Sequence, residues 1–405
     1  MNLIVVGQGY VGLPLAIAAA KANFVVYGFD IDKFRIRDLK SGLTDSPEVK
    51  SSDLLELQSN ERIHFVDSIP KILEPCIFVI AVPTPLDKDR KPDISMLNKA
   101  CELISSVVSD GSLIINESTS YIGTLNTLIK PTIDSSTGFV NLDYAVAPER
   151  IDPGNTQWSM KNTPRIVAGI NERSTQRAFD FYSTFCDQVH KVSKPEVAEA
   201  AKLFENTFRQ VNIALVNELS NIADSIGFST YETIKAASSK PFGFMPFYPS
   251  IGVGGHCIPV DPSYLAFSAE SVGIEAKFVN LANLTNSSMP KIIAERIKII
   301  LGGNLDTKKV QIAGIAYKPN ILDLRESPAL DLIHQLKSLG ANVSWHDPLV
   351  SKHNDQQSSE LNPDIDLGLI VTPHDQIDFS IWKKSGVKVL DLSANSKNYG
   401  WPKFL

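Results

Sequence analysis

Short apolar runs alternate with helical patterns through the first half of the chain. Residues 2–7 form a short, continuous, β-branched run that predicts a buried strand. A glycine-rich turn and an alanine-rich helix to about Lys21 come next, and then a second predicted strand at 24–29. Further strands are predicted at 63–66, 77–82, 113–117, 144–147 and 166–168. Strands that alternate with helices indicate a parallel sheet covered on both faces.

The pattern changes after Pro195. From Glu196 to Ile226 the chain contains neither Gly nor Pro, and its apolar residues recur at helical spacing. This pattern predicts one long helix, ended by Gly227. A Gly- and Pro-rich segment at 241–262 comes after it, and then a helical stretch at about 287–301.

Strand–helix alternation restarts at Val310 and predicts a second, smaller nucleotide-fold-like domain. Its strands are expected at 310–315, 342–345, 367–371 and 387–391. The chain is therefore predicted to be an α/β protein with three parts. These are an N-terminal Rossmann domain at 1–192, a central long-helix domain at 193–303 and a C-terminal Rossmann-like domain at 304–405.

Composition and charge narrow the class of protein. The 405 residues are 43% hydrophobic and 21% charged, with a net charge of −6 and no basic run. Neither a nucleic-acid partner nor a membrane is expected. The four cysteines are too widely spaced for a zinc site or a dense disulfide framework, so no metal is expected. No leader segment is recognised at Met1, and a cytoplasmic location is predicted.

The turn after the first strand has the pattern of a dinucleotide site. In Gly7-Gln8-Gly9-Tyr10-Val11-Gly12, the first glycine is expected to make the tight turn, the second to admit a pyrophosphate and the third to let helix and strand pack. Asp30 ends the second strand, where an acidic side chain favours NAD over NADP. Arg35 is a candidate to stack on adenine or, alternatively, to hold a 2′-phosphate. The competing interpretation is a plain glycine turn with a surface Asp.

Two more segments lie at the carboxyl ends of predicted strands, where open α/β sheets bind ligands. They are Val82-Pro83-Thr84-Pro85 and Glu117-Ser118-Thr119. The alternative for each segment is an ordinary loop without a binding role.

The segment G-V-G-G-H-C-I-P-V-D-P at 252–262 holds Cys257 between glycines and prolines. Glycines let backbone and ligand come close, and prolines stiffen the backbone after the cysteine. A thiol near a nicotinamide can add to an aldehyde, and the adduct can be oxidised to a thioester that water cleaves. Lys202 shares a helix face with Asn206 and is a candidate cation for the thiolate. A packing role for Cys257, and a solvated Lys202, are the alternatives.

Seven ordered motifs are similar to those of one family. The chain resembles the UDP-glucose/GDP-mannose dehydrogenase family over essentially its whole length. Within it, segments 148–155, 205–218 and 240–249 are most similar to the branch that acts on UDP-N-acetylamino sugars, and 240–249 to UDP-N-acetylglucosamine 6-dehydrogenases. Ser250-Ile251 departs from the family pattern, which has Gly after Tyr-Pro. The motifs are G-Y-V-G-L-P, V-P-T-P, E-S-T, P-E-R, K-L-x-E-N-T, G-V-G-G-H-C-I-P-V-D-P and G-x-A-Y-K-P…D-x-R-E-S-P.

The resemblance implies roles for the matching residues. Cys257 would be the nucleophile, Lys202 an oxyanion or general-acid partner, and Asn206 a group that holds the sugar oxygen. Thr119 and Asp261 would position or activate the hydrolytic water. The catalytic set is completed by Glu149, which would lie against the substrate and handle protons.

Binding roles are implied in the same way. The resemblance implies an NAD site made by Gly7, Gly9, Tyr10, Val11, Gly12, Asp30, Arg35, Thr84, Thr119 and Arg325. It implies a UDP-sugar site, in which cations hold the diphosphate, made by Glu149, Arg150, Lys202, Asn206, Arg209, Phe247, Tyr248, Gly254, Lys318 and Arg325. The C-terminal domain would bind the UDP group.

The leading hypothesis is a four-electron oxidation of UDP-N-acetylglucosamine to its 6-carboxylate by two NAD, with UDP-N-acetylmannosamine or UDP-glucose as alternative substrates. A two-electron dehydrogenase of the 6-phosphogluconate type would leave the cysteine loop and the third domain without a role. A non-catalytic NAD-binding protein is the third possibility. The apolar stripe of the long helix is wide enough to pack against both its own domain and a partner, which favours a homodimer or higher homo-oligomer. A monomer is the alternative.

Overall fold

The computed structural model describes residues 1–44, 46, 48–151, 155 and 157–405. The chain forms two compact units. The first comprises Met1–Glu205 with Ser263–Gly273, and the second comprises Asn206–Pro262 with Ile274–Leu405. The predicted domain boundaries after residues 192 and 303 stay a prediction.

The first unit is built on an eight-stranded sheet with the order β3-β2-β1-β4-β5-β6-β7-β8. Strands β1 to β6 run parallel to one another. The strands are β1 (Asn2–Val6), β2 (Val25–Phe29), β3 (Ile63–Val66), β4 (Ile77–Ile80), β5 (Leu113–Asn116), β6 (Asp143–Val146), β7 (Arg165–Gly169) and β8 (Val189–Lys191).

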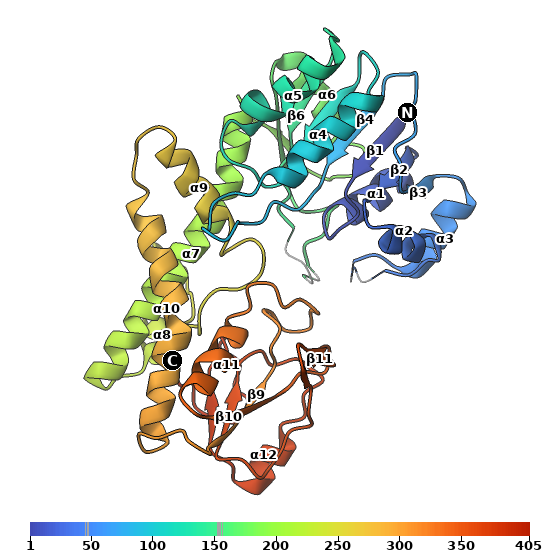
Figure 1. The fold of residues 1–405 in the computed structure, drawn as a ribbon. Coiled ribbons are helices and arrows are strands. Elements are labelled where there is room, and N and C mark those ends of the chain that lie inside the picture. Colours follow the sequence, from blue (N-terminus) through green and yellow to red (C-terminus); the bar gives the residue numbers. More distant parts are fainter. Residues whose placement is uncertain (45, 47, 152–154, 156) are drawn as a thin grey trace. The chain divides into compact units, whose positions relative to one another are not determined.

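Helices cover both faces of this sheet (Figure 1). Along β1, Leu3 and Val5 enter one hydrophobic core, whereas Ile4 and Val6 enter the other. A strand buried on both faces reads as a continuous apolar run, which explains the sequence pattern. The helices are α1 (Gly12–Lys21), α2 (Lys33–Lys40), α3 (Ser51–Ser59), α4 (Ser95–Val107), the π-helical turn η1 (Leu125–Ile129), α5 (Lys130–Thr137) and α6 (Glu172–Tyr182).

The expectation of an all-parallel sheet is wrong at β7, which runs antiparallel to β6. The described part of the connection between them contains no helix. A parallel return is usually made through a helical crossover, so the chain turns back instead. The short, largely exposed β8 was not predicted, because three residues give too little periodicity to detect.

Helix α7 (Pro195–Ile226) has 32 residues and passes from the first unit into the second. Its predicted bounds are confirmed within one residue. Gly227, with a φ of 92°, comes directly after its last turn, in the left-handed conformation that commonly ends helices.

The second unit contains a parallel four-stranded sheet with the order β10-β9-β13-β14. The strands are β9 (Lys309–Ala313), β10 (Asn342–His346), β13 (Leu367–Ile370) and β14 (Val389–Asp391), with a small hairpin of β11 (Lys352–His353) and β12 (Gln356–Gln357). Its helices are α8 (Thr230–Ala237), α10 (Lys277–Ile300), α11 (Pro328–Ser338) and α12 (Ser380–Ser385). The remaining helix, α9 (Asp261–Glu270), begins at the end of the cysteine loop and continues into the first unit.

Helix α10 begins ten residues before its predicted start. Its first turns are rich in Asn, Ser and Thr, which favour turns over helices in isolation. Tertiary contacts hold them instead, because Asn286 accepts a hydrogen bond from Asn217 at 3.0 Å and donates one to the Gln210 carbonyl at 3.2 Å. Among the residues that the structure describes, no helix is both long and apolar enough to cross a lipid bilayer.

Candidate active site

The glycine turn joins β1 to α1 in a conformation that needs glycine at two positions. Gly7 has a φ of 97°, and a Cβ there would overlap the Ala81 carbonyl oxygen. A Cβ at Gly12 would overlap the carbonyl oxygen of Gly7. Gly9 differs, because an added Cβ would meet no atom within 4 Å. The chain itself does not require glycine at this third position, and the open space fits the close approach of a dinucleotide.

The residues next to this turn are held by hydrogen bonds. The Gln8 N–H donates to the Asp30 carboxylate at 2.8 Å, and Arg35 Nε donates to the Gln8 carbonyl. Tyr10 and Val11 are half-buried in the turn. The structure therefore brings all the cofactor residues predicted around β1 and β2 to one carboxyl edge. Their contact with NAD stays a prediction.

A second group gathers at the carboxyl ends of β5 and β6. Thr119 and Lys202 line one small hollow, and Lys202 is only 8% exposed. Asn116, Ser118, Ser120, Val146, Pro148 and Glu199 complete its lining. Thr84 lies after β4, where its carbonyl accepts a hydrogen bond from the Tyr264 hydroxyl at 3.2 Å. Two of the predicted catalytic residues, Thr119 and Lys202, thus lie together within the first unit.

Glu199 is a buried acid of this hollow that the sequence analysis missed. Its carboxylate accepts hydrogen bonds from the N–H groups of Gly123 and Leu125 and so fixes the turn after Thr119. Burial raises the pKa of Glu199 to about 7, although these N–H groups act in the opposite direction. An acidic residue three positions before Lys202, within the apolar stripe of the helix, was the available signal.

Glu149 lies at the same edge, in a buried ionic network. Its carboxylate accepts from the N–H groups of Arg150 and Ile151 and from Arg165 Nη2 at 2.9 Å. Burial alone would raise its pKa, but Arg165, the Ile151 N–H and Lys202 together hold the pKa of Glu149 below its ordinary value. The position predicted to handle protons is therefore an ionised carboxylate close to Lys202.

Arg150 is turned away from that network. Its guanidinium pairs with Glu205 on α7 at 2.6 Å, and its Nη1 donates to the Pro164 carbonyl at 2.9 Å. Both partners belong to the first unit. The residues after Ile151 in the branch-specific segment 148–155 lie partly outside the described residues, at 152–154.

The cysteine turn is the centre of the second unit's site. Cys257 is partly exposed, and its carbonyl accepts hydrogen bonds from the N–H groups of Val260 at 3.1 Å and Asp261 at 2.8 Å. Asp261 begins α9 and is 1% exposed. Asn206 on α7 donates to the Asp261 carboxylate at 2.6 Å. The structure thus brings three predicted catalytic residues together around one turn.

The glycines before Cys257 allow close packing against the residues that precede α11. An added Cβ at Gly254 would lie 2.8 Å from the Cβ of Tyr317, and one at Gly255 would lie 2.8 Å from its ring. The Gly255 N–H donates to the Arg325 carbonyl at 3.0 Å. Arg325 is clamped by Asp323 and contacts His256 Nδ1 at 3.1 Å. Arg325 and the partly exposed Lys318 therefore both lie on segments that adjoin the cysteine loop.

The other predicted substrate residues also belong to the second unit. The Phe247 ring lies 5.9 Å from that of Phe208, and Tyr248 stacks on Tyr231 at 5.4 Å. Arg209 is exposed on α7. Ser250 and Ile251, which depart from the family pattern, both make contacts within the fold. The Ser250 N–H donates to Asn217 at 2.8 Å, and Ile251 is 3% exposed in a hydrophobic core.

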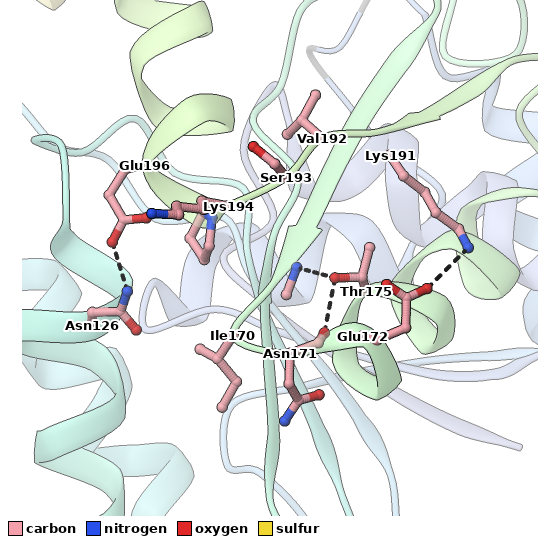
Figure 2. A pocket seen from close by; sticks show the side chains of 12 residues that line it. Asn126, Ile170, Asn171, Glu172, Thr175, Lys191, Val192, Ser193, Lys194 and Glu196 are labelled. Atoms are coloured by element: carbon pink, nitrogen blue, oxygen red, sulfur yellow. Dashed lines mark hydrogen bonds and ion pairs between the residues drawn. The ribbon is translucent and has the colours of Figure 1, made fainter.

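A surface hollow of about 790 Å³ in the first unit contains none of the predicted site residues (Figure 2). It lies where β7 ends. The N–H of Ile170, just after β7, donates to the carbonyl of Tyr144 near the start of β6, so this end of β7 lies at the amino edge of the parallel strands. Figure 2 shows Lys191 turned toward Glu172 and Asn126 toward Glu196. Lys191, Glu172 and Glu196 thus each pair with another residue that lines the hollow.

Several known nucleotide-sugar dehydrogenases are similar to this chain. UDP-N-acetyl-D-glucosamine 6-dehydrogenase from Pseudomonas aeruginosa is 34% identical over 370 residues, which cover 90% of this chain and 86% of that protein. UDP-N-acetyl-D-mannosamine dehydrogenase from Methanocaldococcus jannaschii is 35% identical over 349 residues, covering 85% and 79%. The solved structure of a Pyrococcus horikoshii UDP-D-ManNAc dehydrogenase has a TM-score of 0.87 and 29% identity, and covers 99% of this chain and 98% of that one.

Three domains of one family match the chain in order. They are the NAD binding domain at residues 1–186, the central domain at 196–288 and the UDP binding domain at 311–392. Together they cover most of the sequence and confirm the predicted fold class, the NAD cofactor and the enzyme class. The chain therefore belongs to the UDP-glucose/GDP-mannose dehydrogenase family of NAD-dependent oxidoreductases.

Proposed function

We propose that the chain oxidises the C6 hydroxyl of a UDP-N-acetylhexosamine, UDP-N-acetylglucosamine above all, to the carboxylate. The observation that carries this proposal is the Cys257 turn, in which Asp261 and Asn206 are hydrogen-bonded beside a partly exposed thiol. A relative with UDP-N-acetylglucosamine in its name supports this choice of sugar. UDP-N-acetylmannosamine is the second candidate, because other similar proteins carry that sugar in their names.

The chemistry proceeds in three steps. The alcohol first loses a hydride and a proton to give the C6 aldehyde. The Cys257 thiolate then adds to the aldehyde carbon, and loss of a second hydride converts the thiohemiacetal to a thioester. Water finally cleaves the thioester, releasing the carboxylate and restoring the thiol. Two bound NAD molecules, used in turn, accept the two hydrides.

The described side chains supply the remaining functions. Lys202 is a cation buried beside Thr119, suited to stabilise the oxygen that loses its proton. Asp261, whose N–H donates to the Cys257 carbonyl, activates the water during thioester hydrolysis. Arg325 and Lys318 offer positive charge for a diphosphate.

The experiment is an NADH-release assay with four UDP-sugars: N-acetylglucosamine, N-acetylmannosamine, N-acetylgalactosamine and glucose. The proposal expects two NADH per sugar consumed, fastest with N-acetylglucosamine, and no free aldehyde. Cys257→Ser should stop turnover or halt it after the first adduct. The matched control is Cys101→Ser, because Cys101 is a buried thiol of α4. A Cys257→Ser enzyme with full activity and two NADH would refute the covalent route.

We further propose that the protein works as a homodimer in the cytoplasm. In the second unit, α7 exposes large apolar side chains at helical spacing: Phe208, Leu215, Ile222 and Ile226. Leu215 is 64% exposed, and such a row on a helix favours burial against a partner. The four cysteines, all described as thiols, are consistent with a reducing compartment.

A further inference from the structure

Arg165 begins β7 and lies between two carboxylates of the first unit. Its Nη1 donates to Glu117 at 2.8 Å and its Nη2 to Glu149 at 2.9 Å. Nη1 also donates to the Ala147 carbonyl at 3.2 Å, and the guanidinium lies 4.7 Å from the centre of the Tyr182 ring. The side chain of Arg165 is only 4% exposed. A guanidinium fixed at both edges and on one face has little freedom to move.

The two carboxylates beside Arg165 differ in the direction of their pKa shifts. Burial raises the pKa of Glu117 to about 7, and Glu149 adds to the effect. In contrast, Arg165 and Lys202 help to hold the pKa of Glu149 below its ordinary value. Arg165 lowers the pKa of both carboxylates and is the counterion that Glu117 and Glu149 share.

Glu149 is oriented by the same contacts. One carboxylate oxygen accepts the N–H groups of Arg150 and Ile151, and the other accepts Arg165. A carboxylate has about four acceptor sites, so these bonds leave one for a further donor. Pro148, the residue before Glu149, lines the hollow that holds Thr119 and Lys202.

We propose that Arg165 is a positioning residue of the active site, which anchors Glu149 as a carboxylate beside the hollow lined by Thr119 and Lys202. Glu117, hydrogen-bonded by the Tyr182 hydroxyl, is the second anchor that holds the guanidinium in place. The proposal rests on the proposed function only in that Glu149 acts on the substrate there. Arg165 lies outside the motifs shared with the family and acts on the site through Glu149.

Among the other groups of this cluster, Glu117 titrates near neutral pH, whereas Cys186 and Tyr182 do so only at high pH. Cys186 has its pKa raised to about 11 by burial, and burial also raises the pKa of Tyr182 well above its usual value. The titratable groups that act on Glu149 are Arg165 from β7, Glu117 after β5, Cys186 after α6 and Lys202 from α7. Without Arg165, the buried carboxylate of Glu149 would be protonated at higher pH.

The test compares Arg165→Met and Arg165→Lys with the wild type in the pH dependence of kcat. Arg165→Met should move the acidic limb upward by about one pH unit or more and lower kcat at pH 7 by roughly 10- to 100-fold, with the KM for UDP-sugar changed less. Arg165→Lys keeps the charge but not both edges, so it should recover part of kcat. Arg177→Met, which removes the ion pair between Arg177 on α6 and Asp143 on β6, is the control and should leave the pH profile unchanged.

An infrared titration gives a readout independent of turnover. The protonated-carboxyl band lost in Glu149→Gln identifies Glu149, and Arg165→Met should make it appear at higher pH. A folded Arg165 variant with an unchanged pH profile and an unchanged band would overturn the proposal. If Arg165→Met does not fold, Arg165→Lys decides it by the same criteria. If the wild type releases no NADH with any UDP-sugar, the proposed function fails, while the infrared band still decides the role of Arg165.

Discussion

Asn206 on the long helix donates a 2.6 Å hydrogen bond to Asp261, the first residue of the helix that begins after Cys257. Both side chains are more than 90% buried. The Asp261 N–H in turn donates to the Cys257 carbonyl. This pair therefore ties the cysteine turn to the longest helix of the protein and fixes the backbone that presents the thiol.

Asn206→Ala should weaken both stability and catalysis. Removing a partner of a buried carboxylate costs about 1–3 kcal/mol, so the free energy of unfolding in urea should fall by that amount. The kcat should fall more than the fraction unfolded explains. Asn212→Ala, on a more exposed face of the same helix, is the control and should cost less than about 0.5 kcal/mol. Equal losses in both variants would argue against a special role for the Asn206–Asp261 bond.

Substitutions of Gly9 and Gly12 in the turn after β1 should have different effects. Gly9→Ala should leave the melting temperature nearly unchanged, because the added Cβ meets no neighbour. It should raise the Kd for NADH by about tenfold or more if the pyrophosphate occupies that space. Gly12→Ala should instead destabilise the fold itself, since its Cβ would overlap the Gly7 carbonyl oxygen. Calorimetry for binding and thermal melts for stability separate the two effects, and tight NADH binding by Gly9→Ala would contradict the proposed cofactor position.

The raised pKa of Glu199 predicts a pH-dependent stability. Its pKa is about 7 in the folded protein, against an ordinary value of 4.5, so the folded state binds the proton more tightly. This contribution is complete below pH 4.5 and is lost as pH rises through 7, for a total of roughly 3 kcal/mol. Glu199→Gln should therefore flatten the decline in unfolding free energy between pH 4.5 and about 7. The control is Glu196→Gln, one turn earlier on α7, and an equal slope in all three proteins would refute the assignment.

The exposed row on α7 predicts self-association. Leu215→Glu would place a charge in the middle of this row and should convert a dimer to monomers, as measured by light scattering after gel filtration. Glu218→Lys, on a neighbouring exposed position, is the control for a charge change alone and should leave the mass unchanged. A monomeric wild type at micromolar concentration would contradict the dimer.

The sequence predicted most elements because their patterns are unambiguous. The run at 2–6 is buried on both faces, and α7 keeps helical spacing for its whole length without an internal Gly or Pro. The direction of β7 could not be read, since strand direction depends on the connection and not on the strand's own residues. The early start of α10 was hidden because contacts from α7 stabilise turns that its own residues disfavour.

Some residues of the candidate site could likewise be predicted from the sequence, and others could not. Motifs identified residues such as Cys257 and Lys202, because their surroundings in the sequence are unusual for core residues. Arg165 and Glu199 escaped notice, since each lies in an apolar segment and acquires its role only from groups distant in sequence. A charged residue within an apolar strand or stripe is the signal that could have flagged both.

The substrate is proposed to become bonded to Cys257 during turnover. The most direct measurement is intact and peptide mass spectrometry of Asp261→Asn after acid quench, with UDP-N-acetylglucosamine and NAD present. This substitution keeps an acceptor for Asn206 but removes the charge proposed to activate water, so the acyl adduct should accumulate. We expect an added mass on the peptide containing Cys257, absent when Cys257→Ser is combined with it. NADH formation without any adduct on that peptide, accompanied by free aldehyde, would contradict the covalent route.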